Sequence, residues 1–161
     1  MPEPVALADF LSFSYDTGLR ASGGRHTALG SAAVAAAEFS GVRYQAPADF
    51  RVRELRGSRM RTVAALFDEC AAALQFPYYF RPNKDSFDEC LLSLDESLGE
   101  AGGYVIAIRD AEQLLADAPG EREWFASVVE ECADFWPSRE VVFRVILQGA
   151  PSGLTAIPIR L

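Results

Sequence analysis

Short, continuous apolar runs rich in β-branched residues constrain the fold of this chain most strongly. The runs YVIAI at residues 104–108 and VVFRVIL at 141–147 are typical of strands buried on both faces of a parallel sheet. A third segment, FRVREL at 50–55, alternates apolar and polar residues, as a half-buried strand does. These three segments predict the strands of one sheet.

Helical patterns separate the three strands. Thr62 is positioned to cap a helix that starts at Val63 and is ended by Pro77. Further helices are expected at residues 83–98, 109–118 and 121–135. Strands that alternate with helices at this spacing predict an α/β fold, with a small three-stranded parallel sheet packed with helices.

The two ends of the chain differ from this central part. Residues 1–45 are rich in Gly, Ala and Ser, with one helix expected at 31–39. We expect 1–45 to be an N-terminal extension that acts as a packing arm or linker. Residues 46–150 are expected to be the single domain, and 151–161 a C-terminal tail. A length of 161 residues, 50% of them hydrophobic, suits one such domain.

The charge is acidic and unevenly placed. The formal net charge is −8, and residues 61–161 hold seventeen acidic residues against seven Arg and one Lys. Because Lys and Arg provide the affinity for nucleic-acid backbones and anionic lipids, this charge disfavours both as direct partners. A basic protein is the partner that electrostatics favours, although acidity that serves only solubility is the alternative.

Neither the cysteines nor the N-terminus indicates export or a bound metal. Cys70, Cys90 and Cys132 are too widely spaced for a zinc knuckle and odd in number for a disulfide framework, which suggests reduced, buried thiols. The lone His26 is expected to be a surface loop residue. Residues 1–16 have no basic leader region, and no apolar run approaches a membrane span. We therefore expect a cytoplasmic protein with no cofactor, metal or membrane contact.

The Arg-rich segment RVRELRGSRMR, residues 51–61, is of a kind found in nucleic-acid-binding proteins. Here its Arg residues alternate along an expected strand and turn within an acidic chain. We interpret the segment as a solvated sheet edge.

The helix expected at 83–98 is amphipathic. At about 3.6 residues per turn, its apolar stripe consists of Phe87, Cys90, Leu91, Leu94 and Leu98. The opposite side carries Asp85, Asp88, Glu89 and Glu96, with Leu92 among them. Like charges at this spacing repel by a few tenths of a kcal/mol for each pair, so the acidic row suggests a role toward a partner.

Aromatic residues precede this helix. Tyr78, Tyr79 and Phe80 lie in a loop bounded by Pro77 and Pro82. Tyrosines beside an acidic row make a protein-binding anchor, since Tyr contributes a large contact area for little entropy. The alternative is that the rings plug the core end of the helix, and the sequence leaves both interpretations open.

Catalysis is not expected. Asp85 and Glu89 lie one helical turn apart, and such a pair does acid–base work only if one carboxyl sits in an apolar pocket that raises its pKa. On an exposed helix face both stay ionised. No phosphate-cradling glycine motif and no serine elbow accompanies them.

Eight residues of the stretch ALQFPYYFRPNKDSFDECL, residues 73–91, follow one family pattern in order and without a gap. They are Pro77, Tyr79, Phe80, Asn83, Asp85, Phe87, Cys90 and Leu91. In these residues the stretch resembles the barstar family of intracellular ribonuclease inhibitors. The flanking RELRGSRMRT and YVIAIRDAEQLL segments, with the closing helix and strand, extend the resemblance over residues 50–148.

The resemblance implies a barstar-like fold and inhibition of a basic ribonuclease or related toxin, as an immunity protein does. The helix and its loop would enter the enzyme's active site, with carboxylates at the places of RNA phosphates. Carried over by position, the contact residues are Tyr79, Asn83, Asp85, Glu89 and, on the last helix, Glu131. The exposed loop and acidic row add Tyr78 and Asp88. The alternative is a scaffold or regulatory interaction module that keeps the fold without the inhibitor surface.

The chain departs from the family pattern at four contact positions. Arg81 stands in place of Gly, Lys84 in place of Trp or Leu, and Glu89 in place of Asp. Asp88 takes a position that is often aromatic. Two added cations oppose a uniformly basic partner, so a related toxin stays open as the target.

Overall fold

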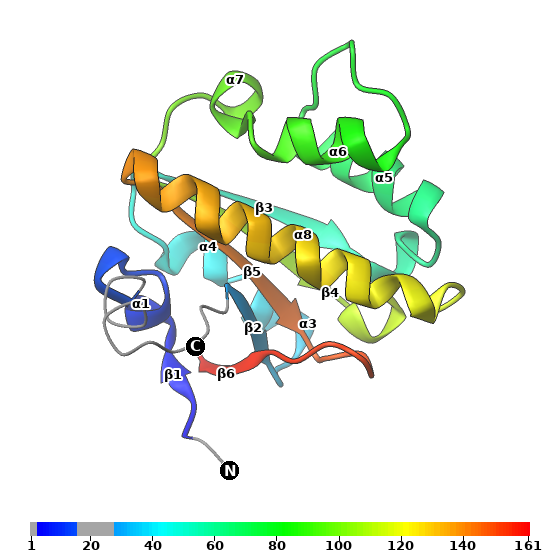
Figure 1. The fold of residues 1–161 in the computed structure, drawn as a ribbon. Coiled ribbons are helices and arrows are strands. Elements are labelled where there is room, and N and C mark those ends of the chain that lie inside the picture. The colour runs from blue at the N-terminus through cyan, green and yellow to red at the C-terminus, as the bar shows by residue number, and fades with distance from the viewer. Residues whose placement is uncertain (1–2, 16–27) are drawn as a thin grey trace.

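The computed structural model describes residues 3–15 and 28–161, and these form a parallel sheet with helices on both faces (Figure 1). The strands are β1 (Val5–Ala6), β2 (Leu29–Ala32), β3 (Phe50–Arg56), β4 (Gly103–Arg109), β5 (Val142–Gln148) and β6 (Ile157–Arg160). The helices are α1 (Leu7–Phe10), α3 (Ala36–Phe39), α4 (Val42–Gln45), α5 (Val63–Ala73), α6 (Lys84–Leu91), α7 (Leu94–Leu98) and α8 (Arg122–Phe135). Short 3₁₀ turns are η1 (Gly57–Arg59), η2 (Ala111–Gln113), η3 (Pro119–Glu121) and η4 (Trp136–Arg139).

The three expected strands are confirmed as β3, β4 and β5, which pair in parallel. Val52 lies opposite Val105, and Ile106 lies opposite Val145. Thr62 is also confirmed as the N-cap of α5, since its hydroxyl accepts the Ala65 N–H at 3.1 Å. The α/β class and the parallel sheet therefore follow from the local pattern.

The prediction of a three-stranded sheet is wrong, because the described residues form six strands in the order β1-β6-β2-β5-β4-β3. The added strands come from the two ends of the chain. β2 pairs with β5 on one side and with β6 on the other, and β1 pairs with β6. These strands are short, and LGSA and IPIR lack a strong strand pattern. They are stabilised by pairing with a buried neighbour rather than by their own propensity.

Two apolar cores cover the two faces of the sheet. Alternate β4 residues divide between them, because successive side chains of a strand point to opposite faces. Ile106 and Ile108 pack with residues of α5, α6 and α8 in the larger core. Val105 and Ala107 pack with residues of α1, α3 and α4 in the smaller core. α6, which carries the acidic residues of the candidate site, is packed on the sheet through the larger core.

A buried arginine joins the N-terminal segment to the smaller core. Arg144 on β5 is fully buried, its Nε donates to the Phe10 carbonyl at 2.8 Å, and its guanidinium lies over the Phe10 and Tyr15 rings. Gly30 on β2 leaves room for the Ile159 and Phe10 side chains that pack against it. A Cβ at this position would lie 2.6 Å from Ile159 and 3.1 Å from Phe10.

Two helix predictions outside the acidic stretch are wrong. Residues 31–39 do not form one helix: the chain first pairs in β2, and only α3 is helical. In place of a helix at 109–118, the structure has the single turn η2. The N–H of Leu115 donates to the Met60 carbonyl at 2.7 Å and that of Asp117 to the Arg61 carbonyl at 2.9 Å. Backbone groups that bond to a distant loop are not available for helical hydrogen bonds.

The single helix predicted at 83–98 is also wrong, because it is divided into α6 and α7. α6 ends at Leu91 with Leu92 as its C-cap, and the Ser93 N–H donates back to the Cys90 carbonyl at 3.2 Å. The break turns the chain so that Leu94 is fully buried in the larger core. The acidic residues of the two helices are consequently not on one continuous face.

Candidate functional site

The loop between α5 and α6 divides its aromatic side chains into two sets. Phe76 and Phe80 point toward the core, with ring centroids 5.0 Å apart, and Phe80 lies 6.1 Å from Phe67. Tyr78 is 96% exposed and Tyr79 is 46% exposed. The two interpretations left open by the sequence thus apply to different residues: the phenylalanines plug the core, and the tyrosines stay accessible.

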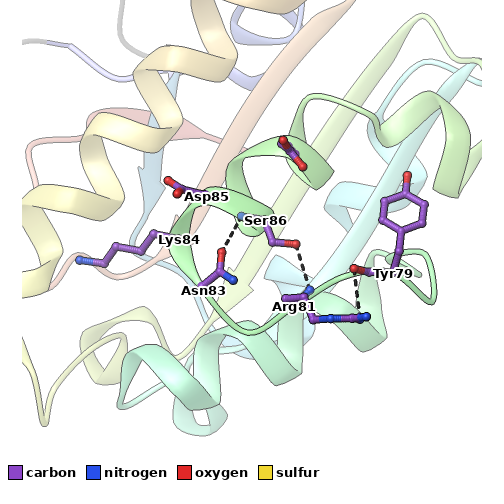
Figure 2. Close-up of a pocket in the computed structure, with 7 residues that line it drawn as sticks. Tyr79, Arg81, Asn83, Lys84, Asp85 and Ser86 are labelled. Atoms are coloured by element: carbon purple, nitrogen blue, oxygen red, sulfur yellow. Dashed lines mark hydrogen bonds between the residues drawn. The ribbon is translucent and has the colours of Figure 1, made fainter.

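Hydrogen bonds within the loop hold its shape (Figure 2). The Ser86 hydroxyl accepts the Arg81 N–H at 2.9 Å, and the Arg81 guanidinium donates to the carbonyls of Tyr79 and Phe80, each at 3.3 Å. The Tyr79 hydroxyl donates to the Glu96 carboxylate on α7 at 3.0 Å, and this bond raises the pKa of Tyr79. Arg81 therefore braces its own loop.

The start of α6 is capped by Asn83, whose side-chain oxygen accepts the Ser86 N–H at 2.8 Å. Asn83 is consequently a structural residue as well as a candidate contact. Asp85 lies in the first turn, where the helix dipole favours a negative charge. The cap and the dipole together place this carboxylate at a defined point on the surface.

Lys84 reaches the neighbouring helix α8. Its Nζ lies 2.7 Å from the Glu121 carboxylate and 4.8 Å from the centre of the Trp124 ring. The ammonium group is thus neutralised within the molecule and ties α6 to the start of α8. Both cations that depart from the family pattern, Arg81 and Lys84, have partners of their own.

The loop and α6 enclose an open hollow of about 460 Å³. It is lined by Tyr79, Arg81, Asn83, Lys84, Asp85, Ser86 and Glu89 (Figure 2). Asp85 and Glu89 are exposed and lie one helical turn apart. Two accessible carboxylates at the rim of a polar hollow suit the binding of a cationic group.

Asp88 lies on the α8 side of the site. It is partly buried, and its Oδ1 has no hydrogen-bond partner among the described residues. Burial raises the pKa of Asp88, and the charges of Glu131 on α8 and of Asp85 raise it further. Asp88 and the exposed Glu131 thus form a second acidic group beside α6.

The seven candidate residues therefore fall into three places. Those around the hollow are Tyr79, Asn83, Asp85 and Glu89. Tyr78 projects from the loop, and its ring centroid is 5.6 Å from that of Tyr79. Asp88 and Glu131 make up the group between α6 and α8. The sequence did not identify Ser86, Glu96 and Glu121 as supports of the site, because each acts through a partner that only the folded chain brings near.

The described cysteines are free and buried, and burial raises the pKa of Cys70, Cys90 and Cys132. Over residues 3–15 and 28–161, no three His, Cys, Asp or Glu side chains gather as a metal site, and no helix is long and apolar enough to cross a membrane. His26 lies outside the described residues.

The segment that builds this site matches a known protein family. Residues 50–148 match the family model of barstar, the barnase inhibitor, and the chain belongs to the barstar family. The matched region begins at the first residue of β3 and ends at the last residue of β5, so it includes the loop, α6 and α8. No curated protein matches the sequence.

Proposed function

We propose that this protein inhibits a basic ribonuclease or a related nuclease toxin by covering its active site with α6 and the loop before it. Asp85 and Glu89 take the places of RNA phosphates, and Tyr79 and Tyr78 pack against the enzyme. Asn83, Asp88 and Glu131 complete the contact surface. The protein works by binding, without a cofactor, and acts in the cytoplasm as an immunity protein.

One observation carries this proposal. Within the segment that matches the barstar family, Asp85 and Glu89 are exposed one turn apart, beside an accessible Tyr79 and a polar hollow. Carboxylates directed at a basic active site attract the enzyme over distance and exclude partners of like charge. The loop is held by hydrogen bonds within the free protein, so little entropy is lost in ordering it on binding.

Inhibition of RNA cleavage by barnase, and by a panel of other basic ribonucleases, tests the proposal. We expect Asp85→Ala with Glu89→Ala to weaken inhibition of the target about a thousandfold, because charge pairs buried on binding are worth about 2 kcal/mol or more each. Raising the ionic strength should slow association, since the Debye length falls from about 30 Å at 0.01 M to about 3 Å at 1 M.

Asp9→Ala with Glu38→Ala is the matched control. It removes the same charge from exposed positions on α1 and α3, the helices of the other sheet face. We expect this control to inhibit like the unmodified chain. If the variant with Asp85→Ala and Glu89→Ala inhibits as strongly as the unmodified chain, the proposed site is refuted. If the unmodified chain inhibits no enzyme of the panel, the proposed function is refuted.

The alternative is an interaction module that binds a protein without inhibiting a nuclease. The observation that favours it is the guanidinium of Arg81 at the same hollow as the two carboxylates. A partner for such a mixed surface needs an acidic group opposite Arg81 as well as basic ones. Binding of a nuclease that leaves its RNA cleavage unchanged would favour this alternative.

A further inference from the structure

The Arg-rich segment contributes no residue to the lining of the hollow, and it begins on the last strand at one side of the sheet. β3 pairs with β4 and ends the strand order there. Residues 50–54 of this strand are all partly exposed. Residues 40–67 hold six Arg against two acidic residues, in a chain whose net charge is −8. Three of these, Arg51, Arg53 and Arg56, lie on β3 itself, and Arg56 is paired with Glu69.

The backbone of β3 shows which of its residues face outward. The Asp49 carbonyl, just before the strand, accepts the Gly102 N–H at 3.0 Å, so the odd-numbered residues bond toward β4. The Phe50 N–H instead donates to the Pro47 carbonyl at 3.0 Å. Because backbone groups alternate sides along a strand, the N–H and C=O groups of the even-numbered residues point away from β4, toward the unpaired edge.

Two further hydrogen bonds on the unpaired side of β3 agree with this alternation. The Val52 carbonyl accepts the Arg53 guanidinium at 3.1 Å, and the Arg56 N–H donates to the Glu69 carboxylate at 2.9 Å. The outward N–H groups of Val52 and Glu54, which lie on either side of the Val52 carbonyl, have no hydrogen-bond partner in the described part of the chain. The edge is therefore occupied at Phe50, at the Val52 carbonyl and at Arg56, and it is open at the N–H groups of Val52 and Glu54.

The charges beside this opening are not neutralised within the described residues. Arg51 and Arg53 share one face of β3, and both are partly exposed. Arg51 donates to the Leu98 carbonyl at 3.3 Å, and neither Arg51 nor Arg53 forms an ion pair with an acid that the structure describes. Guanidinium groups two residues apart on a strand match carboxylates at the same spacing on an added strand.

We propose that the β3 edge binds a short, extended, acidic segment of a partner protein. The segment pairs with the N–H groups of Val52 and Glu54 as an added strand, and its alternate carboxylates contact Arg51 and Arg53. A second copy of this chain docking β3 against β3 would place like charges opposite each other, which is unfavourable. The site is separate from the proposed inhibitor surface and does not depend on it.

A labelled nine-residue peptide of alternating Glu and Val tests the proposal with the full chain at low salt. We expect saturable binding, and hydrogen exchange at Val52 and Glu54 that is slowed about tenfold by the peptide. Arg51→Gln with Arg53→Gln should weaken binding about tenfold, because two exposed charge pairs are lost. Arg51→Lys with Arg53→Lys should retain most of the affinity, which separates lost charge from disturbed folding.

Arg139→Gln with Arg160→Gln removes the same charge from η4 and β6 and should bind like the unmodified chain. The proposal is overturned by absence of binding, by equal affinity in the Arg51 and Arg53 glutamine variant, or by unchanged exchange at Val52 and Glu54. Tighter binding of an oligouridylate than of the peptide would assign the edge to RNA instead. Protection of the same amides that grows with protein concentration, without peptide, would assign it to self-association.

Discussion

At the scale of single residues, the acidic surface contains two kinds of carboxylate. Asp85 and Glu89 are exposed, whereas Asp88 is partly buried and close to Glu131. The sequence pattern placed all three α6 acids together on the solvent side. Only packing against α8 separates Asp88 from the others, because burial depends on a helix about forty residues further along the chain.

Asp88→Asn should stabilise the protein at neutral pH. The pKa of Asp88 is raised in the folded state by burial, Glu131 and Asp85. The folded state therefore holds this proton more tightly than the unfolded state, and stability falls as pH rises from the unfolded pKa of about 3.9 through the folded value. Asn does not ionise, so the variant does not lose this stability as the pH rises. Its urea midpoint should be higher than that of the unmodified protein at pH 7 and equal to it below about pH 3.

Urea denaturation across this pH range measures the difference. Asp9→Asn on α1, an exposed position, is the control and should leave the midpoint nearly unchanged. A lower midpoint for Asp88→Asn at pH 7 would show that the ionised carboxylate is stabilising, in contradiction to its buried, unpartnered oxygen.

At the scale of elements, caps and single buried side chains decide where the helices begin and what they contact. Asn83 caps α6 as Thr62 caps α5, and in both the side-chain oxygen accepts an N–H three residues ahead. The Thr62 cap was predicted from the sequence. Asn83 was identified only as a contact residue, although it has the same local signal of a polar cap before an apolar pattern.

Asn83→Ala should lower the free energy of unfolding by about 1 kcal/mol, the usual value of an N-cap. It should also speed hydrogen exchange at the Ser86 N–H, which loses its acceptor. Asn83→Asp keeps an acceptor and should retain most of the stability. Equal exchange at Ser86 in the alanine variant would show that the cap is not formed in solution.

Arg144→Met should loosen α1 from the sheet. The substitution keeps an unbranched apolar side chain but removes the hydrogen bonds to the Phe10 and Phe143 carbonyls, each at 2.8 Å. Hydrogen bonds from charged donors contribute about 1.5–3 kcal/mol each, so the loss of two is expected to lower the free energy of unfolding by about 3 kcal/mol or more in urea denaturation. Hydrogen exchange should accelerate first at Leu11, whose N–H bonds to Leu7 in the attached segment.

At the scale of the whole molecule, the family-matched region does not include the whole sheet. Residues 50–148 contain β3, β4 and β5, while β1, β2 and β6 lie outside them. β2 covers the open side of β5, and Ile146 packs in the core shared with α1 and α3. The division into an extension, a domain at 46–150 and a tail therefore stays a prediction.

A chain limited to residues 46–150 tests that division. Its β5 would become an edge strand, and Ile146 would lose the cover of α1 and α3. We expect its Tm to fall by about 10 °C or more, since about 2 kcal/mol shifts a domain of this size by that much. Exposure of an apolar edge should also promote association. A fragment with unchanged Tm that stays monomeric would show that the ends of the chain are dispensable.

Local patterns in the sequence were enough to predict the features that depend on residues close together in the chain. They are three buried or half-buried strands, their parallel order, the capped helix α5, and the loop and acids that mark the barstar family. Each follows from residues within one element, where periodicity, caps and proline act over a few positions.

The other features depend on contacts that form only in the folded chain. β2 is a strand because β5 offers a buried partner, and β6 in turn pairs with β2. Leu94 is buried because the chain breaks after α6, and Lys84 turns to α8 because Glu121 and Trp124 are there. Each of these depends on a contact between residues far apart in the chain, and the free energy of such a contact is absent from any local pattern.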